Sequence, residues 1–157
     1  MTLTGKHALG ASQETAYRLL LDPATLQACL PGCERLNQVA ADRFEAVMKL
    51  GIAGLRGTFS GKVTIKDQVP PEAFTLALEA RGPTGLVKAE GRIVLRAAGP
   101  TRCEVDWTGD VRVTGVMAAV GPRIIGGAAT MMAGQFFDAL ERRLPPPGGP
   151  PGPPASA

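Results

Sequence analysis

The side chains that most often carry out chemistry are scarce in this sequence of 157 residues. There is one histidine, His7, and there are three cysteines, Cys29, Cys33 and Cys103. Cys29 and Cys33 are four residues apart, but no second pair and no neighbouring histidine completes a set of zinc ligands. No serine, cysteine or acid can be placed beside His7 as a catalytic partner. The sequence therefore predicts no catalytic residue, no metal site and no cofactor.

Nearly all of the acidic residues lie on the polar sides of the expected strands and helices, where contact with solvent explains them. Asp22 precedes Pro23, so it is better explained as the cap of a helix than as a base. An acid–base enzyme needs an ionisable group positioned inside its site. This distribution favours binding over turnover.

Net charge and cysteine content limit the expected binding partners and the expected cellular compartment. The net charge of +3 permits weak attraction to an acidic partner or an anionic membrane surface. No cluster of lysine and arginine with interleaved aromatic residues appears, so nucleic acid is not an expected partner. An odd number of cysteines, and a start (MTLTGKHALGAS) without the pattern of a secretion signal, predict a cytoplasmic protein.

The elements that would position a site begin with a strand over Leu3–Gly10, followed by two short helices. Ser12 is placed to cap the first helix, and apolar residues recur behind it at helical spacing. Asp22 and Pro23 start the second helix, which ends at the next Pro-Gly pair.

From residue 35 to residue 114 the hydrophobic period changes to two. In RFEAVMKLGI, for example, Phe44, Ala46 and Met48 alternate with Glu45 and Lys49. Repeated alternation of this kind indicates antiparallel strands with one wet face. Turn signals separate them at Pro70-Pro71, Gly82-Pro83 and Gly99-Pro100. Strands and helices do not alternate along this region, so a parallel sheet is not expected.

The last element is a long helix from about Met117 to Leu144, and Pro122 near its start is a place where the helix could kink or begin. Its apolar face is expected to lie against a curved sheet that wraps around it. That face contains Ile125, Ala128, Ala129, Met132, Phe136, Ala139 and Leu140. Residues 145–157 are rich in proline and glycine and carry no charged side chain, so we expect a disordered tail after a folded domain of residues 1–144.

The segment GPRIIGGAATMMAG, residues 121–134, is the most apolar in the chain. A transmembrane span needs about 20 mostly apolar residues. Pro122 and Arg123 interrupt this stretch, and Asp138 and Glu141 follow it, so we predict no span. Gly127 lies on the polar side of the helix, where a neighbouring loop could pack closely; the pattern offers no reason for Gly126.

The inward faces of the sheet and the helix provide the candidate site, an apolar cavity under the first half of the long helix. Its predicted lining is Phe44, Met48, Phe59, Phe74, Trp107, Val111, Ile125, Ala128, Met132 and Phe136. Small inward residues would leave room there: Ala46, Gly61, Ala89, Gly91 and Gly109. Such a cavity suits long, flat or greasy molecules. An ordinary packed core is the alternative for each residue.

Four blocks of the sequence resemble the CoxG family of carbon monoxide dehydrogenase subunits, within the START-like (SRPBCC) helix-grip superfamily. They are LLLDPATLQACLPGCERL at Leu19–Leu36, the glycine-rich Gly54–Gly61, Gly85–Gly91, and Gly121–Leu140 with its FF-x-x-L ending. The resemblance implies an α+β helix-grip fold. This fold has a curved antiparallel sheet of about seven strands, two short helices after the first strand, and one long C-terminal helix over the sheet.

The resemblance further implies a non-enzymatic accessory protein of a molybdenum-containing carbon monoxide dehydrogenase or related hydroxylase. Such a protein binds a lipid or quinone-like molecule and helps to recruit the enzyme to the inner face of the membrane. The tail lacks the apolar terminal helix of some relatives, so a tail-borne anchor is not expected. Two alternatives stay open: an assembly adaptor with a vestigial cavity, and an enzyme like the polyketide cyclases of the same superfamily. The second requires His7 and an acid inside the cavity.

Overall fold

The computed structural model describes residues 1–52 and 55–144. Its elements, in chain order, are β1 (Thr2–Leu9), α1 (Gln13–Leu20), α2 (Pro23–Cys29), β2 (Cys33–Ala40), β3 (Arg43–Ile52), β4 (Leu55–Val69), β5 (Ala73–Gly82), β6 (Gly85–Gly99), β7 (Arg102–Thr114), the 3₁₀ helix η1 (Val116–Val120) and α3 (Pro122–Arg143). The predicted order of elements is confirmed. The tail predicted for residues 145–157 lies outside the described residues.

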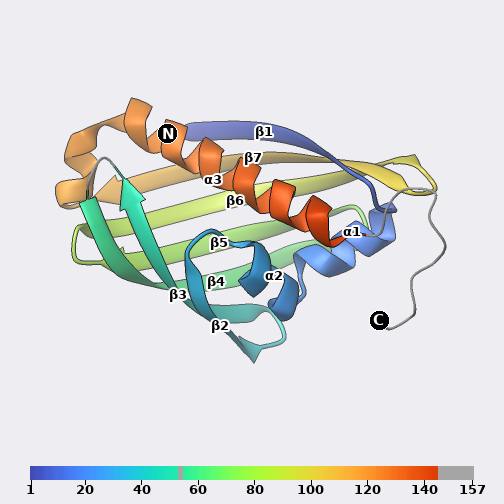
Figure 1. The fold of residues 1–157 in the computed structure, drawn as a ribbon, viewed down its shortest axis with the longest axis horizontal. Helices are drawn as coiled ribbons and strands as arrows, with labels where there is room; N and C mark the ends of the chain where they lie inside the picture. The colour runs from blue at the N-terminus through green and yellow to red at the C-terminus, as the bar shows by residue number, and fades with distance from the viewer. Residues whose placement is uncertain (53–54, 145–157) are drawn as a thin grey trace.

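The seven strands form one sheet in the order β1-β7-β6-β5-β4-β3-β2, and every neighbouring pair is antiparallel. Consecutive strands pair throughout, except that β1 crosses to the far edge and pairs with β7. Figure 1 shows α3 lying along one face of this sheet, with α1 and α2 beside its second half. We call the face covered by α3 the inner face.

Two predicted helix caps are present. The Ser12 hydroxyl accepts a hydrogen bond from the Thr15 amide at 3.2 Å, at the start of α1. A carboxylate oxygen of Asp22 accepts from the Thr25 amide at 2.9 Å and from the Thr25 hydroxyl at 2.8 Å. Asp22 therefore caps α2, because it satisfies an amide at the helix start that has no partner within the helix.

The expected start of the long helix near Met117 is wrong, because α3 begins at Pro122. Gly121, with φ of 91°, breaks the path between η1 and α3. A φ in that region strongly favours glycine. Proline then fits the first helical position, where no amide is needed for a helical hydrogen bond. Within residues 1–52 and 55–144, no helix combines the length and apolarity needed to cross a bilayer.

The main hydrophobic core occupies only one end of the space between sheet and helices. Its members are Leu9, Ala11, Ala16, Tyr17, Leu20, Cys29, Leu36, Phe44, Ala46, Ile65, Phe74, Leu95, Cys103, Val105, Phe137 and Leu140. From α3, only the second half contributes, through Phe137 and Leu140. Phe59, Met117 and Ile125 are buried outside this cluster. The first half of α3 therefore covers a different part of the sheet.

Candidate functional site

Strand register pairs small side chains with one another at several places on the inner face of the sheet. Ala46 of β3 is paired with Gly61 of β4, and Gly61 with Ala80 of β5. Two rows farther along the inner face, Gly91 of β6 faces Gly109 of β7. Because small residues meet small residues across the strands, little side-chain volume rises from these positions of the inner face.

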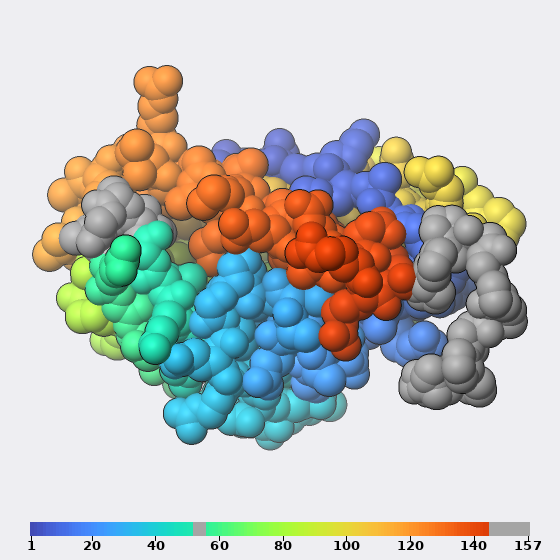
Figure 2. Space-filling view, viewed as in Figure 1, coloured from blue at the N-terminus to red at the C-terminus, as the bar shows by residue number. Residues whose placement is uncertain are grey.

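The larger apolar side chains around these rows are only partly buried. Leu78, Val111 and Val113 share the inner face, and Met132 lies on α3, yet all four keep some exposure and none belongs to the main core. In Figure 2 the surface is recessed between the orange first half of α3 and the green β3. This end of the inner face is therefore apolar but incompletely filled, which is the character expected of a site for a hydrophobic ligand.

The ten residues predicted to line the cavity fall into two sets. Deeply buried are Phe44, Phe59, Phe74 and Ile125. Half-buried are Met48, Trp107, Val111, Ala128, Met132 and Phe136. Phe44 and Phe74 are members of the main core, whereas Val111, Ala128 and Met132 lie outside it. Contact of either set with a ligand stays a prediction, and the second set is the better placed for it.

Trp107 contributes a polar group, its indole N–H, to this apolar wall. It is paired across the strands with Gly5, and a Cβ built on Gly5 would lie 2.4 Å from the indole ring. The indole of Trp107 therefore lies directly over the glycine. Its Nε1 is buried and has no hydrogen-bond partner among the described residues. A buried donor without an acceptor costs about 1–3 kcal/mol, so an acceptor brought by a ligand would be stabilising.

His7 lies on the same inner side of β1 as Gly5 and stacks on Phe137, with ring centroids 4.2 Å apart and planes at 20°. Burial lowers the pKa of the imidazole below its ordinary value of 6.5, and the carboxylate of Asp138 opposes this shift. Among the described residues, no hydrogen bond joins His7 to an acid. The sequence analysis did not decide which way His7 faces. The alternation of Leu3, Gly5, His7 and Leu9 along the strand was the signal that could have placed it on the inner face.

The three cysteines are free thiols, with Cys29 and Cys103 buried and Cys33 half-buried. Burial raises the pKa of each thiol, so the neutral form is favoured and none is activated as a nucleophile. In the part of the chain that the structure describes, no group of three or more histidine, cysteine, aspartate or glutamate residues could hold a metal ion.

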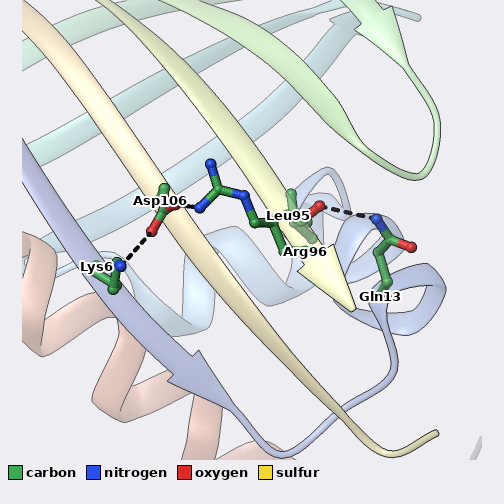
Figure 3. Close-up of polar contacts among 5 residues, drawn as sticks. All are labelled: Lys6, Gln13, Leu95, Arg96 and Asp106. Carbon is green, nitrogen blue, oxygen red and sulfur yellow. Dashed lines mark hydrogen bonds and ion pairs between the residues drawn. The ribbon is translucent and has the colours of Figure 1, made fainter. Parts of the chain in front are cut away.

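The outer face of the sheet has a different character. Figure 3 shows Asp106 between Lys6 and Arg96: one carboxylate oxygen lies 4.0 Å from Lys6 Nζ, and the other is bound by the Arg96 guanidinium. The same view shows Gln13 donating to the Leu95 carbonyl at 2.9 Å, which ties α1 to β6. Charged pairs at the surface are well solvated and bind apolar molecules poorly.

Two open depressions lie on that outer face, with volumes of about 340 and 520 Å³. Charged residues from β4 to β7 line the larger one, and two of its acids are paired: Glu90 with Lys66 at 3.1 Å and Glu79 with Lys88 at 3.8 Å. These depressions suit water and ions. The inner face is the better candidate for a hydrophobic ligand.

Comparison with known families shows to which protein family this chain belongs. The model of the CoxG family, whose description is that of a carbon monoxide dehydrogenase subunit, matches residues 5–145, which is most of the chain. The chain belongs to the CoxG family. The resemblance drawn from the sequence is thereby confirmed. No curated protein is significantly similar in sequence to this CoxG-family chain.

Solved structures confirm the START-like fold of this CoxG-family member. A conserved protein from Geobacillus kaustophilus is 29% identical, with a TM-score of 0.86 over 90% of this chain and 93% of its own. A START superfamily protein from Mycobacterium smegmatis is 17% identical, with a TM-score of 0.70 over 90% and 95%. The Zhui aromatase/cyclase from Streptomyces sp. R1128 is 13% identical, with a TM-score of 0.69 over 96% and 99%. At such identities, the last two show the fold alone.

The block Leu19–Leu36 that carried the family resemblance spans the end of α1, all of α2 and the start of β2. It closes the core end, where Leu20, Cys29 and Leu36 are buried. In this CoxG-family chain the block therefore supports the scaffold. The candidate site lies farther along the sheet, under α3.

Proposed function

We propose that this CoxG-family chain binds a hydrophobic molecule, a lipid or a quinone-like compound, between α3 and the inner face of the sheet. In this proposal it is a non-enzymatic accessory protein of a molybdenum-containing carbon monoxide dehydrogenase or related hydroxylase, and it helps to recruit that enzyme to the membrane. One observation carries the binding proposal: apolar inner-face side chains under the first half of α3 are only partly buried and lie outside the main core. The family description supports the association with carbon monoxide dehydrogenase.

The wall also suggests the chemistry of the ligand. It is apolar apart from the Trp107 indole, whose N–H is buried without a partner among the described residues, and the neighbouring His7 imidazole. A flat or chain-like molecule that carries a carbonyl or ester oxygen would offer the missing acceptor. Because Nε1 is enclosed, the indole must turn or α3 must shift slightly for that hydrogen bond to form.

A direct test is extraction of the purified protein, followed by mass spectrometry of the extract. In parallel, a short-chain ubiquinone would be titrated while the fluorescence of Trp107, the only tryptophan, is followed. We expect a co-purified lipid or quinone and a saturable fluorescence change. No extracted ligand and no response to the quinone would reject the binding proposal.

A matched pair of variants locates the binding. Ala128→Phe places a ring on the inner side of α3, where Ala128 is half-buried, and Thr130→Phe places the same ring on the exposed side two residues later. We expect Ala128→Phe to lose ligand and Thr130→Phe to keep it. Equal retention by both variants would place the ligand elsewhere.

The same pair separates the carrier from an adaptor with a vestigial cavity. If Ala128→Phe loses the ligand but still captures the dehydrogenase in a pull-down, recruitment does not need the cavity. If it loses both, ligand and partner are coupled, which the carrier proposal expects.

A cyclase-like enzyme is the weaker alternative. The Zhui aromatase/cyclase shares the fold, but His7 here stacks on Phe137 and has no hydrogen-bonded acid among the described residues. Under our proposal, His7→Gln binds the quinone as the parent chain does or slightly more weakly. Turnover of an aromatic polyketide substrate that is abolished in this variant would favour the enzyme.

A further inference from the structure

Three large apolar side chains are exposed on η1 and the first half of α3. Val116 of η1 is 63% exposed, and Ile124 and Met131 of α3 are 48% and 59% exposed. Ile124 and Met131 are seven residues apart, so they lie on the same side of the helix. We call Val116, Ile124 and Met131 the apolar rim. A solvated surface does not require such a cluster, so it indicates a contact with another body.

The outward side of α3 changes character halfway along. Over its first half it presents Ile124, Gly127 and Met131, and the only charge there is Arg123. After Gln135 it becomes strongly charged, with Asp138, Glu141, Arg142 and Arg143 all exposed. An ordinary solvated helix would carry charge along its whole outer side. The apolar rim is therefore a local feature of the η1–α3 end.

Cations outnumber acids around the apolar rim. Three parts of the chain meet at this end of the molecule: residues 48–52 with 55–60, residues 80–89, and residues 111–132. Their contacts include Met117 N–H to Thr84 O at 2.7 Å, and Gly57 lies against Pro83. These parts contain six cations, and the acids Glu79, Glu90 and Asp110 directly adjoin their ends; the cations are Lys49, Arg56, Arg81, Lys88, Arg112 and Arg123.

Three of these six cations lack an acidic partner within the described residues. Lys49, Lys88 and Arg112 pair with acids that lie outside the three segments. Arg56, Arg81 and Arg123 are exposed and make no ion pair in the part of the chain that the structure describes. Unpaired cations beside exposed apolar side chains complement a surface that is anionic above and apolar below. That is the chemistry of a bilayer with acidic headgroups.

We infer that the apolar rim docks this protein onto an anionic lipid bilayer, with Ile124 and Met131 inserted at the headgroup level and the unpaired arginines on the phosphates. The inference rests on the proposed function for its purpose, since the rim borders the incompletely filled end of the inner face and would bring a bilayer-borne ligand to it. Binding to the bilayer does not depend on that purpose and can be measured alone.

The experiment is flotation of the full chain with phosphatidylcholine vesicles, with and without phosphatidylglycerol. We expect binding to the anionic vesicles that weakens as salt is raised, and little binding to phosphatidylcholine alone. The double variant Ile124→Asp with Met131→Asp should lose about tenfold or more in vesicle binding. The double variant Arg56→Glu with Arg123→Glu should lose the salt dependence.

Two exposed valines at other places provide a matched control. Val39 and Val69 are 54% and 47% exposed, on β2 and β4. The double variant Val39→Asp with Val69→Asp makes the same chemical change, so it should float with the vesicles as the parent chain does. Circular dichroism checks that both double variants are folded.

Three results would overturn the inference: no binding of the parent chain to anionic vesicles, equal loss in the valine control, or loss of dehydrogenase capture without vesicles in the Ile124 and Met131 variant. The last would make the rim a protein-docking surface. Failure of the ligand proposal is separate, because quinone binding in detergent solution needs no vesicle and should survive in the Ile124 and Met131 variant.

Discussion

Trp107 and Gly5 form a matched pair across β7 and β1, in which the glycine provides the room that the indole occupies. A methyl group on Gly5 would lie 2.4 Å from the ring, so the ring must move. We predict that Gly5→Ala lowers the free energy of unfolding by about 1–3 kcal/mol, through overpacking. Urea unfolding followed by the fluorescence of Trp107 measures it.

Gly109→Ala is the control for Gly5→Ala. It lies in the neighbouring inner-face row, and its new Cβ would find its nearest atom at 3.8 Å. This variant should be as stable as the parent chain or slightly more so, because alanine restricts the unfolded chain. Similar losses of unfolding free energy in both variants would mean that replacing any strand glycine is destabilising, whether or not an indole lies over it.

His7 makes stability depend on pH in a direction that its burial determines. Its pKa is lowered in the folded protein, so the unfolded chain takes up a proton first as the pH falls through about 6.5. Stability should therefore decrease on acidification through that window and level off below the folded pKa. His7→Phe keeps a ring against Phe137 but cannot titrate. Urea midpoints at several pH values should show a smaller decrease in the variant, and parallel curves would contradict the assignment.

The two adjacent glycines of α3 have different surroundings. A Cβ on Gly126 would lie 3.3 Å from Leu3 Cδ2, so this glycine allows the helix to approach β1 closely. A Cβ on Gly127 would find no described atom within 4 Å. The loop contact that the sequence suggested for Gly127 is therefore not seen in the described residues, and the unexplained Gly126 has a packing reason.

A pair of alanine variants tests that difference. We predict that Gly127→Ala stabilises the protein by roughly 0.5–1 kcal/mol, since alanine is the better helix former and nothing obstructs it. Gly126→Ala should gain less or lose stability, because Leu3 must give way. Thermal and urea unfolding of the two variants measure this. Equal gains would show that α3 does not press on β1 at this point.

Alternation with a period of two was sufficient to predict β3 to β7, and caps such as Asp22 were sufficient to predict the short helices, whereas β2, whose burial does not alternate, came with the family resemblance. Both signals are local, so they can be interpreted along the chain. Strand pairing, by contrast, brings distant residues together. Neither the stacking of His7 on Phe137 nor the placing of Trp107 on Gly5 can be derived from periodicity. The sequence therefore predicted which residues face inward. Only the structure shows that these residues are buried to different degrees along that face.

Over the whole molecule, packing runs from a full core beside α1 and α2 to a sparsely filled interior under the first half of α3. Regions with few buried apolar contacts open more readily than core strands. We therefore predict that, without ligand, amides of η1 and residues 122–133 exchange hydrogen faster than amides of residues 134–143 in the same helix. Hydrogen–deuterium exchange with mass spectrometry resolves the two halves as separate peptides.

Addition of a ligand should reduce that contrast, because a molecule that binds only the folded state stabilises the part it contacts. A short-chain ubiquinone is expected to slow exchange in residues 122–133 and in the facing segments of β6 and β7. It should leave α1, which contacts the full core, nearly unchanged. The Ala128→Phe variant, with its added ring in the sparse region, should be protected there before any quinone is added. Uniform protection along α3 in the absence of ligand would instead mean that the interior is evenly filled and that the ligand site must be sought elsewhere.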